Sequence, residues 1–324
     1  MSVLVVIECA NGEVKKSSLE AASYGSKVAG SLGTSATAVA IGDVQPEALA
    51  GLGEQGISKV LLDNDARLHD FVAGAYVKVI AKAAEQENSS VIILSNSNIG
   101  SAVGSRLAAR LGASLATNVV SLPEISGTSF KVRKGVFSGK AFADVELTAD
   151  KKIIAVKKNA VDVETQAGNT ASVENFSADL SDADFVGAPK ETIKQSGDIL
   201  LTEADKVVSG GRGLKGPENW HLIEDLAKAL GAATACSKPV ADMGWRPHHE
   251  HVGQTGITVS PNLYMAIGIS GAIQHLAGVN SSKVIVVINK DPEAPFFKAA
   301  DYGIVGDATE VVPKLIEAAK ALDK

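Results

Sequence analysis

The strongest constraint on the fold is a repeated alternation of short apolar runs with longer amphipathic stretches. Residues 3–7 and 91–94 are continuously apolar, as in strands that are covered on both faces of a sheet. Residues 71–85 place apolar side chains at helical spacing, and residues 99–111 are a further expected helix that Gly112 ends. This alternation predicts an α/β fold with a doubly wound parallel sheet.

The pattern of the sequence changes after this first series of strand-like and helix-like stretches. Residues 130–137, 141–147 and 153–156 are β-like runs, which we expect as antiparallel strands added to the same domain. Residues 159–181 are rich in Asn, Thr, Ser, Gly and acidic side chains, and we interpret them as the linker region, with a looser stretch on to Leu200.

The alternation of strands and helices restarts at residue 206. It continues to a very apolar strand at residues 284–288 and a terminal helix at residues 309–322. The sequence therefore predicts two domains, over residues 1–190 and 191–324.

Charge and composition exclude several classes of function. The net charge of −6 disfavours nucleic acid or an anionic membrane as the main partner. Aromatic residues make up only 4% of the chain, which argues against a sugar cleft or a single-strand binding groove, because both rely on stacking.

The expected location is the cytoplasm. Cys9 and Cys236 provide neither a disulfide framework nor a metal quartet, and they fit a reducing compartment. The first residues lack a basic region and include Glu8, so we interpret them as a strand rather than a signal peptide. No apolar run approaches the ~20 residues of a membrane span.

A glycine-rich motif follows the first strand of the second half. Residues 211–216 read GRGLKG and satisfy the G-x-G-x-x-G pattern between an expected strand and an expected helix. Backbone N–H groups in such a loop and the positive end of a helix both suit phosphate. A dinucleotide fold would also need an acidic residue about 20 positions later, but residues 235–238 read ACSK. A tight turn without a ligand explains the motif equally well.

Three further segments combine small and polar residues. Residues 253–256 read GQTG, residues 268–275 read GISGAIQH with Ser270 at an expected helix N-cap, and residues 287–292 end an apolar strand in NKDP. The carboxyl ends of strands are where open α/β sheets bind ligands, which makes Asn289 and Asp307 candidates for a ribose or adenosine contact. Ordinary turns and a structural histidine remain alternatives.

Residues 248–251 read HHEH, but their spacing is not that of a zinc motif and no pair of carboxylates or thiols completes a site. We therefore expect no metal. No order of Ser, His and Asp and no carboxylate pair indicates a hydrolase.

Together these motifs resemble the alpha-subunit family of electron transfer flavoproteins. The most specific match is LYMAIGISGAIQHLAG at residues 263–278, which fits the family signature at each restricted position. Residues 210–216, 252–256, 288–297 and 301–307 are also similar. The resemblance is strong from residue 207 to residue 322, whereas the first half matches by its architecture and by residues 135–145.

The resemblance implies an electron carrier without substrate turnover of its own. Its N-terminal domain would have an adenine-nucleotide-hydrolase-like α/β fold and contact a beta subunit, and its C-terminal Rossmann-like domain would bind FAD. The beta subunit of the heterodimer would hold AMP. Electrons would come from acyl-CoA dehydrogenases and other flavin dehydrogenases, as in fatty acid beta-oxidation, and would pass to a membrane quinone oxidoreductase.

The resemblance also implies a cofactor site. Thr255 would donate a hydrogen bond to flavin N5, and His275 would lie near the N1–C2 edge with a partial or full positive charge. Arg212 would lie beside the flavin and its pyrophosphate, and Ser237 would contact the ring system. The full expected set is Arg212, Ser237, Lys238, His251, Gln254, Thr255, Gly256, Ser270, Gly271, Gln274, His275, Asn289, Lys290 and Asp307. Ser270, Gly271 and Gln274 would hold the phosphate and ribityl region. Asn289, Lys290 and Asp307 would face the adenosine half.

Two positions depart from the family pattern. The family commonly has Ser-Arg where this chain has Ser237 and Lys238, and Lys keeps the charge without the planar guanidinium. His251 stands where many members have Gln, at the position expected to contact flavin O4. We count Lys238, Thr255 and His275 as the flavin-tuning residues.

Two other functions compete with the electron carrier. The C-terminal domain could belong to an NAD-dependent or sirtuin-like enzyme, although the missing acid after Gly216 argues against NAD. The N-terminal domain alone would also suit a nucleotide sensor. Within the carrier family, both electron-bifurcating and simple carriers stay open, because a second FAD would lie in the beta subunit.

Overall fold

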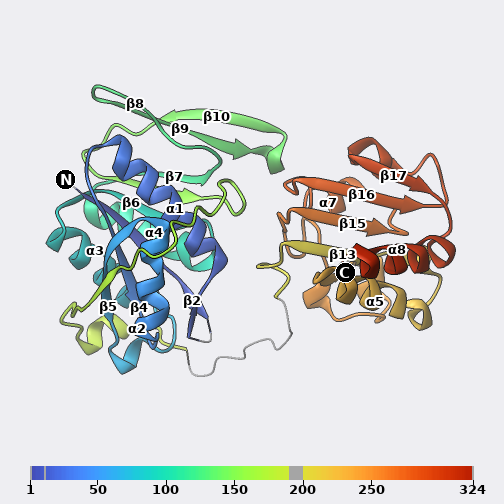
Figure 1. Cartoon of the computed structure of the whole chain (residues 1–324), viewed down its shortest axis with the longest axis horizontal. Coiled ribbons are helices and arrows are strands. Elements are labelled where there is room, and N and C mark those ends of the chain that lie inside the picture. The colour runs from blue at the N-terminus through green and yellow to red at the C-terminus, as the bar shows by residue number, and fades with distance from the viewer. Residues whose placement is uncertain (1, 11, 190–199, 323–324) are drawn as a thin grey trace. The chain divides into compact units, whose positions relative to one another are not determined.

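Two units, each built on its own sheet, make up the chain (Figure 1). The N-terminal unit comprises Met1–Val136 and Ala141–Lys194, and the C-terminal unit comprises Phe137–Lys140 and Gln195–Lys324. The computed structural model describes residues 2–10, 12–189 and 200–322. The domain boundary expected between residues 190 and 191 lies outside these described ranges.

A mixed sheet organises the N-terminal unit. Among the described residues it has ten strands in the order β10-β9-β7-β11-β6-β1-β4-β5-β12, with β8 paired to β9. The strands from β7 to β12 along this order are parallel, whereas β8, β9 and β10 pair antiparallel. They are β1 (Ser2–Ile7), β4 (Ala36–Ile41), β5 (Ile57–Asp63), β6 (Ser89–Ser95), β7 (Ser114–Val119), β8 (Glu124–Ser126), β9 (Ser129–Val136), β10 (Ala141–Glu146), β11 (Lys152–Val156) and β12 (Ser172–Asn175). The predicted doubly wound parallel core with added antiparallel strands is confirmed.

Helices cover both faces of this sheet because its central strands are apolar on both sides. Val3 and Val5 of β1 belong to the core layer under α1, whereas Leu4 and Val6 belong to the layer under α3 and α4. The helices are α1 (Lys16–Ser31), α2 (Pro46–Ala50), α3 (Ala73–Gln86) and α4 (Asn98–Leu111), and a separate ribbon pairs β2 (Cys9–Ala10) with β3 (Glu13–Val14). Gly112 ends α4 in the left-handed conformation, as expected.

Residues 153–156 do not form an added antiparallel strand, so that expectation is wrong. They lie in β11, which runs parallel between β7 and β6 inside the sheet. Ile153 and Ile154 are fully buried, because β11 is covered on both faces. A continuous apolar run is typical of such a strand. In β10, by contrast, half-buried and exposed residues alternate, as expected for a strand with one solvent face.

The interpretation of residues 159–181 as a linker is also wrong. This segment belongs to the N-terminal unit and supplies β12, which pairs with β5 at the edge of the sheet. The Ala171 N–H donates to the Ala50 carbonyl at 2.9 Å, and the Phe176 N–H donates to the Leu62 carbonyl at 2.8 Å. The polar composition of the segment therefore reflects an exposed sheet edge rather than a free connection.

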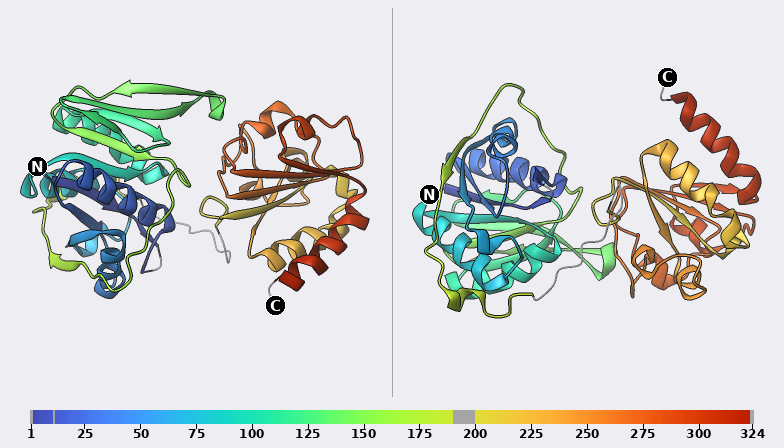
Figure 2. Two further views of the ribbon diagram at one scale, coloured as in Figure 1. Left: turned by 45° about the horizontal axis from the view of Figure 1, so that its top comes forward. Right: turned by 90° about the horizontal axis from the view of Figure 1, so that it is seen from below.

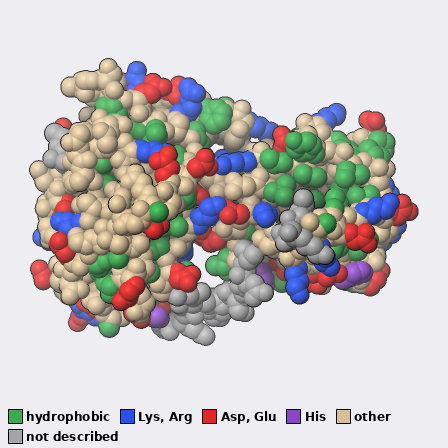
Figure 3. Space-filling view, in the orientation of Figure 1, with side chains coloured by type: hydrophobic (Ala, Val, Ile, Leu, Met, Phe, Trp, Pro, Cys, Tyr) green, Lys and Arg blue, Asp and Glu red, His purple; other side chains and the backbone are tan. Residues whose placement is uncertain are grey.

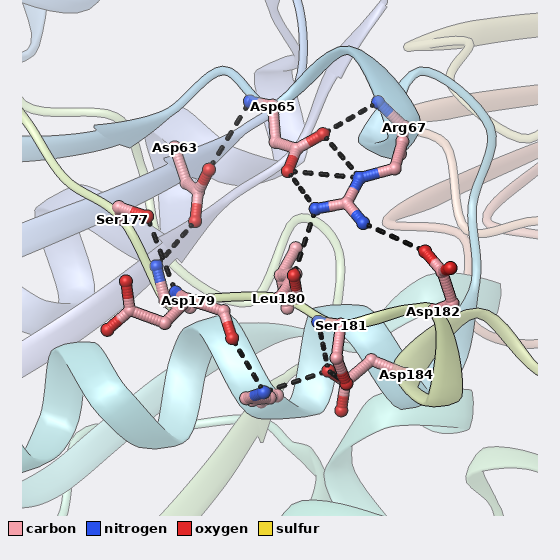
Figure 4. Close-up of polar contacts among 11 residues, drawn as sticks. Asp63, Asp65, Arg67, Ser177, Asp179, Leu180, Ser181, Asp182 and Asp184 are labelled. Atoms are coloured by element: carbon pink, nitrogen blue, oxygen red, sulfur yellow. Dashed lines mark hydrogen bonds and ion pairs between the residues drawn. The ribbon is translucent and has the colours of Figure 1, made fainter.

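Charged side chains fasten the end of this segment to the loop after β5 and to α3 (Figure 4). Arg67 contacts Asp65 at 2.6 Å and Asp182 at 3.4 Å, and Lys78 of α3 contacts Asp184 at 2.8 Å. Hydrogen bonds from Arg67 and from Lys78 lower the pKa of Asp65 and of Asp184, respectively, to about 2. These contacts explain why a stretch with the composition of a linker is ordered on the surface of the unit.

The C-terminal unit has a parallel sheet of five strands within the described residues, in the order β14-β13-β15-β16-β17. Helices α5 and α8 lie on the same side of this sheet (Figure 2), whereas loops and the short α7 cover the other side. The elements are β13 (Lys206–Gly210), α5 (His221–Leu230), β14 (Ala233–Cys236), α6 (Lys238–Asp242), β15 (Leu263–Ile267), α7 (Ile273–Leu276), β16 (Val284–Asn289), β17 (Tyr302–Val305) and α8 (Ala308–Leu322). The Rossmann-like expectation is confirmed.

Strand order places the loops that carry the sequence motifs at one edge of this sheet. From β13 the chain passes to β14 on one side and then to β15 on the other, so a topological switch point lies at the carboxyl ends of β13 and β15. Open α/β sheets bind ligands at such a point.

The helices of the described residues were compared with the length and hydrophobicity that a membrane span requires, and none of them reaches both.

The outermost strand of the sheet, β17, leaves apolar side chains in solvent. Tyr302 is 68% exposed, Val305 is 60% exposed and Ile304 is 37% exposed. Hydrophobic side chains gather on this part of the C-terminal unit (Figure 3). An exposed apolar edge strand is a typical surface for a partner chain.

Candidate functional site

A cavity of about 570 Å³ opens in the C-terminal unit at the carboxyl ends of β13, β15 and β16. Its volume falls within the range of small-molecule and cofactor sites. It is lined by Arg212, Gly213, Ser237, Lys238, Pro239, His251, Val252, Gly253, Gln254, Thr255, Gly268, Ile269, Ser270, Ala272, Gln274, His275, Asn289, Asp291 and Ala294. Ten of the fourteen residues expected from the sequence are in this lining, whereas Gly256, Gly271, Lys290 and Asp307 are not.

Backbone hydrogen bonds join the ends of three strands beneath the cavity. The Gly211 N–H donates to Ile267 at 2.9 Å, the Gly213 N–H donates to Gly268 at 3.0 Å, and the Gly268 N–H donates to Ile288 at 2.8 Å. Helix α5 begins only at His221, after two 3-10 turns. The expectation that the glycine loop presents free N–H groups at a helix N-terminus is therefore wrong at Gly211 and Gly213.

The reason for glycine at position 211 is close packing against the neighbouring loop. Its φ of −117° is open to any residue, but a Cβ atom would lie 2.2 Å from the Gly268 carbonyl oxygen. At Gly213 a Cβ atom would lie 2.6 Å from the Gly268 Cα atom. The glycines of the motif thus allow two loops to meet and shape the floor of the cavity.

The GQTG segment forms a turn that packs on α7. The Gln254 N–H donates to the Gln274 carbonyl at 2.7 Å, which ties the turn to the helix. Gln254 and Thr255 are exposed in the cavity lining, so their polar groups are accessible to a ligand. Gly256 is also exposed but is not part of the lining, and a Cβ atom there would approach the His251 carbonyl oxygen to 2.3 Å.

The signature segment begins its helix later than expected. Helix α7 starts at Ile273 with Ala272 as its N-cap, so Ser270 is not a helix cap. Ser270 instead accepts a hydrogen bond from the Phe296 N–H on its carbonyl, at 3.0 Å, and lies exposed in the cavity lining. Gly271 is buried against Phe296 with a φ of +84°, so its role is to allow this turn.

Two histidines are buried in the cavity wall. His275 is 6% exposed and His251 is 7% exposed. Burial lowers the pKa of both side chains, that of His275 to about 4. Burial therefore favours the neutral form of His275 over the charged form at neutral pH.

The ring of His275 packs among buried side chains. Its Nε2 atom lies 2.9 Å from the Tyr264 hydroxyl, and Phe296 contacts the ring edge to face at a centroid distance of 5.7 Å. Its Nδ1 atom is buried without a hydrogen-bond partner in the described part of the chain. The Val252 backbone lies close enough to raise the pKa of the ring, so protein encloses this nitrogen and His275 shapes the wall of the cavity.

Cationic side chains lie at the rim of the cavity. Arg212 and Lys238 are both exposed, and Lys238 forms an ion pair with Asp242 at 2.9 Å, one turn further along α6. Ser237, the residue before α6, is buried in the same lining. The rim therefore combines positive charge, which suits an anionic ligand, with hydroxyl and amide groups.

The residues expected at the adenosine half have mainly structural contacts. Asn289 lines the cavity, but its side chain donates to Ile269 at 3.0 Å and accepts from the Asp291 N–H at 3.1 Å. Asp307 pairs with Lys215 at 2.9 Å and accepts from Thr309 at the start of α8. The hydrogen bond from Lys215 lowers the pKa of Asp307 well below its usual range. Lys290 is exposed outside the lining.

Several lining residues were not among the candidates: Gly213, Pro239, Val252, Gly253, Gly268, Ile269, Ala272, Asp291 and Ala294. Most are sequence neighbours of expected residues, so their segments carried the signal. Pro239 carried no signal of its own, and the structure places it in α6 after β14. Asp291 and Ala294 lie within residues 288–297, whose similarity to the family indicated this segment without singling them out. Within the described ranges, no three His, Cys, Asp or Glu side chains are grouped to hold a metal ion.

Known protein families match segments in both halves of the chain. The family described as "Electron transfer flavoprotein domain" matches residues 3–181, and "Electron transfer flavoprotein FAD-binding domain" matches residues 200–280. The chain is 37% identical over 323 residues to "Electron transfer flavoprotein subunit alpha" of Bacillus subtilis, covering 99% of this chain and 98% of the relative. It is 39% identical over 325 residues to the subunit of the same name of Mycobacterium tuberculosis, covering 98% of each. The chain therefore belongs to the electron transfer flavoprotein family, among its alpha subunits.

Proposed function

We propose that this chain carries electrons on one FAD bound in the cavity of the C-terminal unit. The observation that carries the proposal is the position of the cavity, which opens at the switch point of the sheet and is lined mostly by residues of the segment that matches the FAD-binding family. The bound FAD supplies the redox chemistry. The chain supplies the binding surface, the orientation of the ring system and the surrounding charge.

The roles of individual residues are part of this proposal. Thr255 and Gln254 present polar groups to the ring system, Ser270 and Gln274 contact the phosphate and ribityl region, and Arg212 supplies charge near the pyrophosphate. Each of them lies exposed in the cavity lining, which supports such contacts.

The expected residues outside the lining act indirectly in this proposal. Gly256 and Gly271 allow the loops to close around the cavity, and Asp307 positions Lys215 of the glycine loop through their ion pair.

The partner of the chain is proposed to be an electron transfer flavoprotein beta subunit that holds AMP. The exposed apolar side chains of β17, together with Leu122 and Phe142 of the N-terminal unit, support association with another chain. Acyl-CoA dehydrogenases of beta-oxidation as donors, a quinone oxidoreductase as acceptor and a cytoplasmic location are proposals that follow from the family.

Coexpression of the full chain with its beta-type partner tests this function. We expect a yellow heterodimer with the visible spectrum of bound flavin, which an acyl-CoA dehydrogenase reduces in the presence of its substrate. A colourless chain that binds NAD would contradict the proposal and favour the dehydrogenase or sirtuin-like alternative. The end of β14 argues against that alternative, because Cys236 and Ser237 stand where an acid would bind ribose.

The substitution Lys238→Arg is expected to shift the midpoint potential of the bound flavin. Arg can place a planar guanidinium against a ring, whereas Lys238 is a point charge that is shared with Asp242. Asp242→Asn is the matched variant, which leaves Lys238 in place and is expected to raise the potential by removing a nearby negative charge. Spectroelectrochemical titrations measure both effects. Superimposable titrations of Lys238→Arg and the unchanged protein would contradict the role of this position.

A further inference from the structure

Arg246 forms a two-point ion pair with Glu250, and neither side chain lines the cavity. The Nε atom of Arg246 donates to Oε2 of Glu250 at 2.9 Å, and its Nη2 atom donates to Oε1 at 2.6 Å. Two parallel hydrogen bonds between a guanidinium and a carboxylate fix the orientation of both groups. The Glu250 side chain is only 11% exposed, so this pair constrains its loop more than a surface ion pair would.

Arg246 is itself held on the body of the C-terminal unit. Its guanidinium carbon lies 5.5 Å from the centroid of the Trp220 ring, and Trp220 is buried in the core layer under α5. Its remaining nitrogen, Nη1, donates to Glu224 of α5 at 3.0 Å. Arg246 therefore fastens the loop at Glu250 to α5 and to the core beneath that helix.

The residue after this ion pair, His251, supports the turn that carries the GQTG motif. A Cβ atom at Gly256 would lie 2.7 Å from Nδ1 of His251, and a Cβ atom at Gly253 would lie 3.3 Å from Nε2. The imidazole ring thus packs directly against both ends of the turn. Gln254 and Thr255, between the two glycines, are exposed in the cavity lining, so the place of the ring determines where their polar groups lie.

We propose that Arg246 is a positioning residue, which holds His251 in place through Glu250 and thereby fixes the GQTG turn beside the bound flavin. The inference rests on the proposed function for the identity of the ligand, whereas the anchoring of the loop is a property of the chain itself. Arg246 does not line the cavity, so it acts only through the loop.

The variant Arg246→Gln tests the proposal, because it removes the guanidinium and leaves Glu250 without its cation. Glu224→Gln is the matched control, since it removes the other carboxylate partner of the same arginine. Glu224 is 50% exposed and lies on α5 rather than on the loop. A general effect of weakening the contacts of Arg246 would appear in both variants, whereas release of the loop would appear only in Arg246→Gln.

The first measurement is the rate at which iodoacetamide alkylates Cys236 in the full chain without FAD, followed by mass spectrometry of peptides. Cys236 is fully buried at the end of β14, and its carbonyl accepts a hydrogen bond from the Val252 N–H at 3.0 Å. Burial, followed by the nearby charge of Glu250, raises the pKa of its thiol to about 12, so the ion pair lies close to this thiol.

Release of the loop should expose the Cys236 thiol. We expect alkylation to be about tenfold faster in Arg246→Gln and to change by less than about twofold in Glu224→Gln. Cys9 of the N-terminal unit is the internal reference and should react at one rate in all proteins. Equal rates at Cys236 in the unchanged protein and Arg246→Gln would overturn the anchoring of the loop.

The second measurement is FAD titration of the deflavinated heterodimer, with a visible spectrum at saturating FAD. We expect binding to weaken about tenfold in Arg246→Gln and the absorption bands of the bound flavin to shift, with neither change in Glu224→Gln. A merely structural loss would weaken binding without moving the turn. Bands of Arg246→Gln that coincide with those of the unchanged protein would therefore overturn the positioning role.

The double variant of Arg246→Gln with Glu250→Gln completes a double-mutant cycle. Because the two side chains act as one pair, the double variant should bind FAD no more weakly than the weaker of the two single variants. Fully additive losses would contradict action through Glu250. If none of the proteins binds FAD, the proposed function fails, whereas faster alkylation of Cys236 in Arg246→Gln but not in Glu224→Gln still supports the anchoring of the loop.

Discussion

Replacing Gly211 with alanine is expected to lower the free energy of unfolding of the C-terminal unit by about 3 kcal/mol and to abolish FAD binding. The added Cβ atom would lie 2.2 Å from the Gly268 carbonyl oxygen, so the two loops beneath the cavity must separate. Separation would also break the hydrogen bond from Gly213 to Gly268. Both tryptophans, Trp220 and Trp245, belong to the C-terminal unit, so their fluorescence in a denaturant titration reports on this unit.

Gly244→Ala is the matched control for this substitution. Gly244 has a left-handed φ of +72°, but an added Cβ atom would meet nothing within 4 Å. Its expected cost is about 1 kcal/mol, from backbone strain alone. Alanine at Gly211, where φ is ordinary, should therefore cost more than alanine at Gly244. The reverse order would show that packing between the loops is not what requires glycine at position 211.

The second large effect is expected from pH. The C-terminal unit should lose about 3 kcal/mol of stability as the pH falls from about 6.5 to about 4, because His275 is buried in its neutral form. Its folded-state pKa of about 4 lies below the unfolded value of 6.5, so the unfolded chain binds the proton first. The contribution of His275 is complete above pH 6.5 and is lost as the pH falls toward 4. His251, whose pKa burial also lowers, acts in the same direction.

The variant His275→Gln should flatten this dependence, since it removes the titrating group. His249→Gln is the control, because His249 lies exposed in the loop before His251. Tryptophan-detected unfolding at several pH values between 4 and 7 measures the slopes. A slope that is the same in His275→Gln and in the unchanged protein would contradict the assignment of the acid sensitivity to His275.

The sequence predicted some of the parallel strands of each sheet, such as β1 and β6 in the first and β13 and β16 in the second, because their signal is local. A continuous apolar run such as Val3–Ile7 is typical of a strand that is covered on both faces of a sheet. The apolar stripe of α3 is typical of a helix that buries one face only. β7 and β8 were not expected, because Ser114–Val119 shows neither a continuous apolar run nor a regular alternation. The pairing of β12 with β5 was also missed, since contacts with distant parts of the chain hold that segment.

The candidate site was predicted in part. The signature around His275 and the turn at Thr255 are marked by unusual combinations of polar and small residues, and both lie in the cavity lining. Asp307 showed the same kind of signal but is used to pair with Lys215 and to begin α8. An isolated polar residue after a strand looks the same whether it binds a ligand or caps a helix, so its neighbours in space decide.

The amino-acid sequence by itself determined the α/β class, the two-part organisation and the family, because periodicity and short motifs are properties of the chain read in order. Only the tertiary structure decided which groups are free. The N–H groups of Gly211 and Gly213 form hydrogen bonds within the floor of the cavity, whereas Gln254, Thr255 and Ser270 lie exposed in its lining. Hydrogen bonds between distant segments consume donors and acceptors, and which of them remain for a ligand is settled only when the loops meet.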